Sequence, residues 1–222
     1  MSNAVLLALV AIVPLVLLAL TSFVKISVVL SLLRNALGAP DAPSGLVVTG
    51  LSLVLTFFVM SPVALDMARA ASAPAPAVAP TAAPAPAEPW RALVPAEYTG
   101  TVDQVDRGLG PLRAFLDKHA GAKDKATFVE LARKLGHADV RGDELWVLAP
   151  AFVTSELREA FTVAILIFIP FLVIDLVTAL GLASLGLATT PPQAIALPLK
   201  LLLFVAVDGW RLLIDSLLRG YA

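Results

Sequence analysis

The sequence of 222 residues predicts an all-α protein in which two long hydrophobic helical hairpins flank a small helical extramembrane domain. Its composition is 59% hydrophobic and only 15% charged, with a mean hydropathy of +0.88, whereas soluble domains are nearer half apolar and a quarter charged. Four apolar blocks are each close to the ~20 residues that span a bilayer as a helix. They form two pairs on either side of a polar middle region. The first block is Ala4–Val24, which continues past Lys25 to Leu33, and the others are Leu46–Leu65, Phe161–Leu187 and Ala194–Leu213.

The composition also excludes several kinds of chemistry. The chain has no cysteine, so disulfides, thiolate metal sites and cysteine nucleophiles are absent. Its two histidines, His119 and His137, both lie in the polar middle region and form no metal-binding cluster. A net charge of -1 gives no reason to expect nucleic acid as a partner. We therefore expect no enzymatic activity, no metal and no cofactor.

The first hairpin is predicted over residues 1–70. Residues 34–45 join its two apolar blocks and are rich in turn-forming Asn, Gly and Pro. Because this connection is short, the two helices should run antiparallel. The N-terminal block lacks a basic segment and a clear small-residue cleavage site, so we expect it to be retained in the mature protein.

The middle of the chain divides into a linker and a small domain. Residues 71–89 are almost entirely Ala and Pro and predict an extended, polyproline-like spacer. Residues 90–149 are polar and predict a small helical insert. Thr101 is a candidate cap for its first helix, and Asp124 for a second helix that ends at Gly136. With few large apolar side chains, this insert should depend on the rest of the protein for stability.

The second hairpin is predicted over residues 150–222. Ser155 is the expected N-cap of the third long helix, with Glu156 in its first turn, where negative charge suits the helix dipole. Pro170 should kink this helix. A turn over residues 187–193 then leads into the fourth apolar block.

Charged residues inside the apolar blocks are the main candidates for a functional role. On scales of membrane insertion, each Asp or Lys at a helix centre costs about +2.5 to +3.5 kcal/mol. Lys200 and Asp208 therefore cancel the roughly −6 kcal/mol gained by the apolar residues of the fourth block. Such charges can form buried pairs between helices, line a conduit or relay protons, or reach out to the membrane surface. The candidate assembly residues are Lys25, Arg34, Asp175, Lys200, Asp208 and Trp210, the last being alternatively an interfacial anchor.

Five ordered segments resemble the motifs of the FliP/SctR family, which consists of core export-apparatus subunits of bacterial type III secretion. The resemblance covers nearly all of the chain except about residues 67–149. Lys25, with no evident cleaved leader before it, is more similar to the injectisome branch than to the flagellar branch. The five segments are Thr21–Gly38, Leu55–Val63, Pro150–Phe161, Pro170–Val177 and Pro191–Trp210.

The resemblance implies an assembly and a role. Such subunits form a pentameric ring that joins two smaller membrane subunits in a helical, cone-shaped export gate, beside basal-body ring and export-switch proteins. Unfolded substrate proteins pass through its centre. The gate belongs to the bacterial inner membrane but sits largely on its periplasmic side, which would bury the charges in protein and place the polar insert outside the cytoplasm.

One departure from the family concerns the pore. Many relatives carry consecutive methionines in the turn before the double proline, where an unbranched, flexible side chain suits a deformable seal. This chain has three methionines, all elsewhere. Its seal is therefore looser, or is supplied by a partner, or this segment is only a turn. The candidate pore-loop residues are Leu187, Ala188, Thr189 and Thr190.

Two rival functions remain open from the sequence. A small polytopic transporter with Asp175 as its proton-coupled site would work without partner proteins, as a monomer or dimer with four spans in lipid. A scaffold that nucleates the basal body would assemble with the same partners but never contact a substrate.

Overall fold

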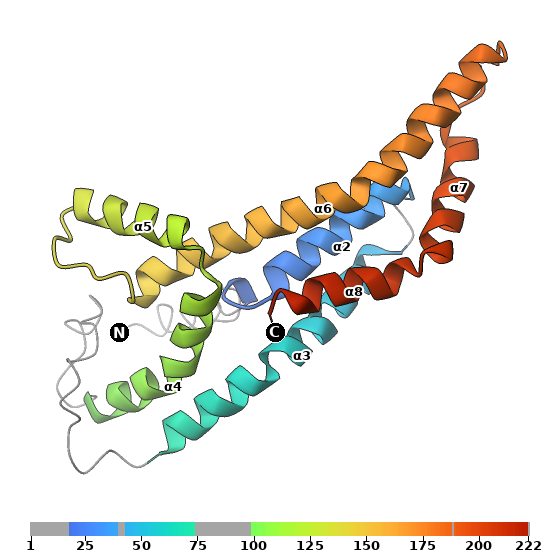
Figure 1. Cartoon of the computed structure of the whole chain (residues 1–222). Coiled ribbons are helices and arrows are strands. Elements are labelled where there is room, and N and C mark those ends of the chain that lie inside the picture. Colours follow the sequence, from blue (N-terminus) through green and yellow to red (C-terminus); the bar gives the residue numbers. More distant parts are fainter. Residues whose placement is uncertain (1–17, 40–42, 74–98, 188, 222) are drawn as a thin grey trace, which may run out of the picture. The chain divides into compact units, whose positions relative to one another are not determined.

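The computed structural model describes residues 18–39, 43–73, 99–187 and 189–221 (Figure 1). All regular secondary structure in these ranges is helical, which confirms the predicted all-α class. Most of the Ala/Pro-rich linker and the start of the first apolar block lie outside the described residues. The helices are α2 (Phe23–Leu37), α3 (Gly45–Ser72), α4 (Thr99–His119), α5 (Ala122–Lys134), α6 (Leu145–Ser184), α7 (Gln193–Ala206) and α8 (Gly209–Arg219).

The chain divides into two compact units. One comprises Met1–Thr21 and Met60–Glu156, and the other comprises Ser22–Val59 and Leu157–Ala222. The helices α3 and α6 each contribute one part to both units, so neither unit is a continuous stretch of sequence.

The core of the second unit is built around α2. Ile26, Val29, Leu30 and Leu33 are buried at the i, i+3, i+4, i+7 spacing that places residues on one helical face. Fully burying each such side chain contributes about 1.5–3 kcal/mol. The α2 helix ends at Gly38, whose φ of 75° is the left-handed conformation that glycine adopts without strain. Partners from the other helices are Phe171 of α6, Phe204 of α7, and Leu213 and Leu217 of α8.

The first unit contains the polar insert. Phe115 of α4 and Phe152 of α6 are buried, with their ring centroids 5.8 Å apart. The end of α5 is a Schellman motif, in which Gly136 has a φ of 98° and its N–H bonds to the Arg133 carbonyl, while the next N–H, of His137, reaches the Ala132 carbonyl. The predicted stop of this helix at Gly136 is thus confirmed, although α5 begins after Gly121 and holds Asp124 in its first turn.

The predicted start of the third long helix at Ser155 is wrong, because α6 begins at Leu145. Just before it, the Glu144 carboxylate accepts bonds from the backbone N–H groups of Arg141, at 3.1 Å, and Gly142, at 2.8 Å. Burial raises the pKa of Glu144, but these bonds outweigh it and hold the pKa of the carboxyl below its usual value. The residues before Ser155 are mostly apolar, and the first turns of α6 are helical because Val147 and Phe152 pack against apolar residues of the insert, a tertiary contact with no local signature.

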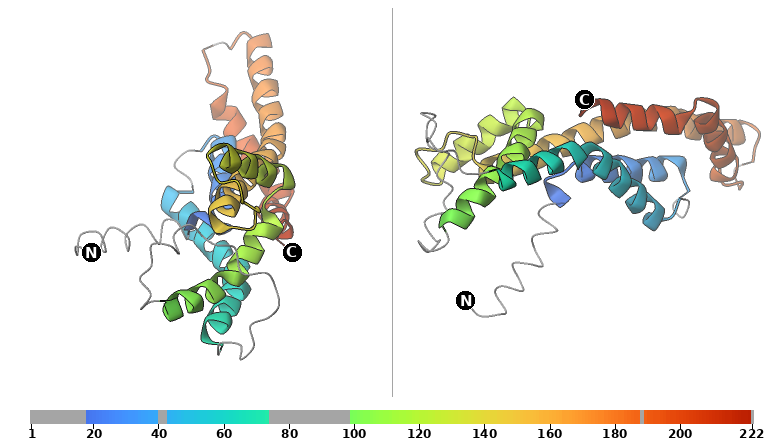
Figure 2. Two further views of the ribbon diagram at one scale, coloured as in Figure 1. Left: turned by 90° about the vertical axis from the view of Figure 1, so that its left-hand side faces the viewer. Right: turned by 90° about the horizontal axis from the view of Figure 1, so that it is seen from below.

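Only part of the four-block prediction is realised as long helices. Among the described residues, two helices are long and apolar enough to cross a membrane, Gly45–Ser72 and Leu145–Ser184. The fourth block is instead divided into α7 and α8, with a change of direction at Val207 and Asp208 that is visible in Figures 1 and 2. Hydropathy did not detect this break because the residues around Asp208 are apolar.

Candidate functional site: two buried lysines and the turn after α6

Lys200 of α7 ties three helices together inside the second unit. Its side chain is only 6% exposed, and its Nζ lies 2.6 Å from Asp175 Oδ2 of α6. The same ammonium group donates a hydrogen bond of 3.0 Å to the carbonyl of Ala36, in the last turn of α2. The final carbonyls of a helix lack intrahelical partners and carry partial negative charge. Lys200 therefore caps α2 while it pairs with α6.

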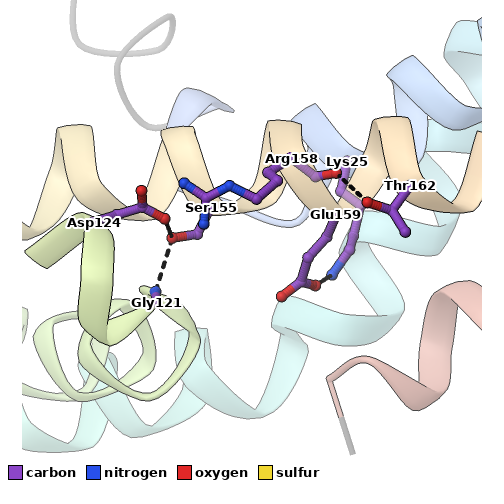
Figure 3. Close-up of polar contacts among 7 residues, drawn as sticks. All are labelled: Lys25, Gly121, Asp124, Ser155, Arg158, Glu159 and Thr162. Atoms are coloured by element: carbon purple, nitrogen blue, oxygen red, sulfur yellow. Dashed lines mark hydrogen bonds and ion pairs between the residues drawn. The ribbon is translucent and has the colours of Figure 1, made fainter.

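Lys25 of α2 forms a second tie to α6. Its side chain is 4% exposed, and its Nζ lies 2.5 Å from Glu159 Oε2 (Figure 3). The ammonium group also lies 4.5 Å from the centre of the Tyr221 ring, near the end of the chain, which is a cation–π distance. Sequence analysis assigned Glu159 no partner, because no local spacing connects residues in opposite hairpins.

Of the charges singled out from the sequence, the structure brings Lys200 and Asp175 together but not Asp208. Asp208 is exposed and lies at the break between α7 and α8, where its φ of 52° is left-handed. The two other candidates, Arg34 and Trp210, line one small apolar pocket with Leu33 of α2. The Trp210 ring also packs edge-on against Phe204, with centroids 5.4 Å apart.

The turn after α6 is an ordered helix end. Gly186 has a φ of 72°, its N–H bonds to the Ala183 carbonyl at 3.1 Å, and the N–H of Leu187 reaches the Leu182 carbonyl at 3.0 Å. This is again a Schellman motif. Leu187 and Thr189 are exposed, Thr190 is half-buried, and Ala188 lies outside the described residues.

Ser155 has a role that the sequence did not indicate. Its Oγ accepts the Gly121 N–H at 2.7 Å and donates to Asp124 Oδ2 at 2.6 Å, so that it joins the start of α5 to the N-terminal third of α6 (Figure 3). The neighbouring Glu156, which was expected in the first turn of the helix, is 1% exposed. We refer to Gly121, Asp124 and Ser155 as the α5–α6 tie.

The chemistry of these groups is that of helix packing. Each lysine is buried and each partner carboxylate is partly exposed, so the charges are neutralised at the edge of the unit rather than isolated within it. Within the ranges that the structure describes, no group of three or more His, Cys, Asp or Glu side chains could hold a metal ion.

An all-α fold with two helices of membrane-spanning length and with ion pairs between its hairpins fits the class of helical membrane proteins. The chain matches the model of the FliP family over residues 6–217, and it belongs to that family. The match covers the described helices from α2 to α7 in full and α8 up to Leu217.

Similar proteins come from two kinds of bacterial system. The flagellar biosynthetic protein FliP of Pectobacterium carotovorum is 43% identical over 94% of this chain and 73% of its own length. The hypersensitivity response secretion protein HrcR of Ralstonia nicotianae is 38% identical over 96% of this chain and 93% of its own length. The Yop proteins translocation protein R of Yersinia pestis is 38% identical over 98% of this chain and 94% of its own length. These similar identities leave the choice of the injectisome branch a prediction.

Proposed function

We propose that this chain is a channel-forming subunit of the type III secretion export gate, through which unfolded proteins cross the bacterial inner membrane. As a FliP-family member, the chain is a membrane component of a type III protein-export apparatus. The family match over residues 6–217 is the observation that carries the proposal, because it includes both hairpins and the turn between α6 and α7. The role requires no catalysis, so the subunit is not an enzyme.

The exposed apolar side chains support assembly with other subunits. Many large apolar side chains exposed on one subunit are typical of a protein or membrane contact. Identical copies of the chain, which are expected to form a pentamer, would cover this surface together with two smaller gate subunits. This coverage would remove the apolar side chains from water. Large apolar side chains exposed on α3 and α6 include Leu46, Phe57, Phe58, Ile165, Leu172 and Leu176.

The two lysine pairs favour packing over proton-coupled transport. A proton-coupled carboxylate must exchange its proton during the cycle, whereas Asp175 lies 2.6 Å from a lysine that also caps α2. Neutralising Asp175 would break this ion pair, which helps to hold α7 in position. In the proposed gate, Lys25 and Lys200 hold each subunit in the shape required for assembly on the periplasmic side of the membrane.

The turn after α6 is the segment that we place closest to the pore. Leu187 is 46% exposed, and the Schellman motif fixes its backbone at the end of a long helix. A defined turn with small side chains suits contact with a passing polypeptide better than closure of the pore. We infer that a partner subunit contributes to the seal.

A stalled export substrate tests this function. A photo-crosslinking amino acid is placed at Leu187 or Thr189, and in a control at Leu135, which is 80% exposed in the polar insert. Crosslinks between the stalled substrate and positions 187 and 189, but not 135, are expected. A normally secreting strain with no crosslink at 187 or 189 would instead favour the non-conducting scaffold.

A further inference from the structure

A narrow apolar groove runs along α6 within the second unit. Its lining comes from Val163–Phe171 of α6 and from the facing sides of α7 and α8, and its volume is about 270 Å³. The buried lining residues include Phe171, Phe204 and Leu213, which belong to the core around α2. The rings of Phe171 and Phe204 lie with their centroids 6.5 Å apart. The groove is thus part of the packed structure of this unit.

The chemistry of the groove requires an apolar occupant. Ser216 of α8 carries the one polar side chain among the described residues that line it. Water in such a space would find too few hydrogen-bond partners, and apolar surface that stays in contact with water is unfavourable. Leu166 and Leu212 also line the groove and are more than half exposed. The groove therefore opens onto an apolar surface, beside a helix of membrane-spanning length.

The size of the groove distinguishes a hydrocarbon chain from a helix. From Val163 to Phe171 the groove follows about 12 Å of α6. A helix of that length with a diameter of ~10 Å would occupy on the order of 900 Å³, which is far more than the groove provides. An extended hydrocarbon chain of the same length, ~4–5 Å wide, occupies on the order of 200 Å³. The groove therefore has the dimensions of one acyl chain.

A basic side chain lies beyond Ser216. Arg219 follows Ser216 by three positions on α8, so that the two side chains share one helical face. The Arg219 Nε donates to Asp215 Oδ2 at 2.7 Å, and the arginine side chain is 78% exposed, which leaves its two terminal nitrogens open to a further acceptor. Phosphate is an acceptor that the planar guanidinium group binds through two nitrogens. A hydroxyl and a guanidinium group beside an acyl-sized groove match the phosphate and the chain of a phospholipid.

We propose that this groove is a phospholipid-binding site, in which one acyl chain lies between α6 and α8 and the lipid phosphate contacts Ser216 and Arg219. The bound chain covers apolar surface that the three helices leave open, and it joins α6 to α8 without a second subunit. This assignment depends on the membrane placement of the FliP family and not on the proposed channel role.

Titration of the purified full-length subunit in mild detergent tests the site. Native mass spectrometry counts the phospholipid molecules bound per subunit, with dipalmitoyl phosphatidylglycerol as the probe, and one tightly bound molecule is expected. Leu212→Trp, which places an indole in the groove, should weaken binding about tenfold or more, because the indole displaces at least two methylene groups of the chain. Leu202→Trp is the matched control, since Leu202 is exposed on α7 and does not line the groove.

A second pair of variants tests the phosphate contact. Arg219→Gln should weaken the binding of phosphatidylglycerol about fivefold, because one cation near the headgroup is lost. The same variant should bind hexadecanol, which has the chain but no phosphate, as the wild type does. Inorganic phosphate, which has no chain, should not compete. Arg211→Gln is the control on the same helix, because the exposed Arg211 lies about two turns away from Arg219.

Equal lipid binding by the two tryptophan variants would overturn the site in the groove. An equal loss of phosphatidylglycerol and hexadecanol in Arg219→Gln would overturn the phosphate contact. If Leu212→Trp binds lipid normally but fails to assemble with copies of the chain, the groove holds side chains of a neighbouring subunit instead. Because binding is measured without a secretion assay, a subunit that binds lipid but exports nothing would contradict only the proposed export function.

Discussion

The two buried lysines show how an apolar subunit accommodates charge. Removing an ammonium group from water costs several kcal/mol unless it gains close partners. Lys200 has a carboxylate and a helix-terminal carbonyl, and Lys25 has a carboxylate and an aromatic face. The partner carboxylates, Asp175 and Glu159, remain 40% and 55% exposed, so they are less desolvated than the lysines. Loss of a carboxylate should therefore be more harmful than loss of its lysine, because it leaves a buried ammonium group without a counter-ion, whereas a partly exposed carboxylate stays hydrated.

Substitutions of this pair test that asymmetry. Lys200→Met keeps an apolar stem but leaves the Ala36 carbonyl and Asp175 without their shared donor, so we expect the complex to lose about 2–3 kcal/mol of stability. Asp175→Asn should cost more, about 3–5 kcal/mol, because it leaves the buried Lys200 ammonium group without its counter-ion. Thermal unfolding and the yield of assembled complex measure both effects, with the exposed Arg211→Met as the control. Normal assembly of Lys200→Met with blocked secretion would assign the lysine to the conduit instead.

At the scale of elements, the α5–α6 tie shows why a serine inside a helix can matter more than a helix cap. Ser155 is 3% exposed and satisfies both the Gly121 N–H, at the start of α5, and the Asp124 carboxylate. The tie thus fixes the start of α5 on the N-terminal third of α6. Glycine at position 121 leaves room for this contact, because a β-carbon there would lie only 3.1 Å from Ser155 Oγ.

Ser155→Ala should loosen the insert selectively. It leaves the Gly121 N–H and the Asp124 carboxylate without their hydroxyl partner, a loss of about 1–3 kcal/mol. Thr154→Ala is the matched control, because the exposed Thr154 hydroxyl bonds only to the Pro150 carbonyl of its own helix. Hydrogen exchange in α5 should accelerate about tenfold in Ser155→Ala. Equal exchange in both variants would mean that the tie contributes little to the position of α5.

At the scale of the whole molecule, features that depend on local sequence could be predicted, and features that depend on tertiary contacts could not. Helical class follows from long apolar blocks, and family membership follows from five ordered motifs, because both depend on local sequence. The pairing of Lys25 with Glu159, 134 positions apart, has no local signature. The start of α6 at Leu145 depends on burial against the insert, and the break at Asp208 on one packed glycine. Such features arise from tertiary contacts, which a hydropathy pattern does not contain.

At the same scale, we predict that the chain assembles with copies of itself and with other small membrane proteins. Exposed apolar residues on α3 and α6 require lipid or neighbouring subunits in the native state. Native mass spectrometry of the detergent-extracted complex should give about five copies of this chain, as the family resemblance implies, and two further small membrane proteins when these are co-expressed. A stable monomer or dimer that ignores those proteins would contradict the gate and favour a transporter, with Asp175 as the first residue to substitute.

The two lysine pairs also restrict how the gene can change in length. Glu159 and Asp175 lie on the same helix, roughly four and a half turns apart, and each faces a lysine on a different helix. A single-codon insertion or deletion between them would rotate one carboxylate by about 100° relative to the other, so that one pair must break. Substitutions can accumulate on the exposed face of this stretch, but insertions and deletions cannot.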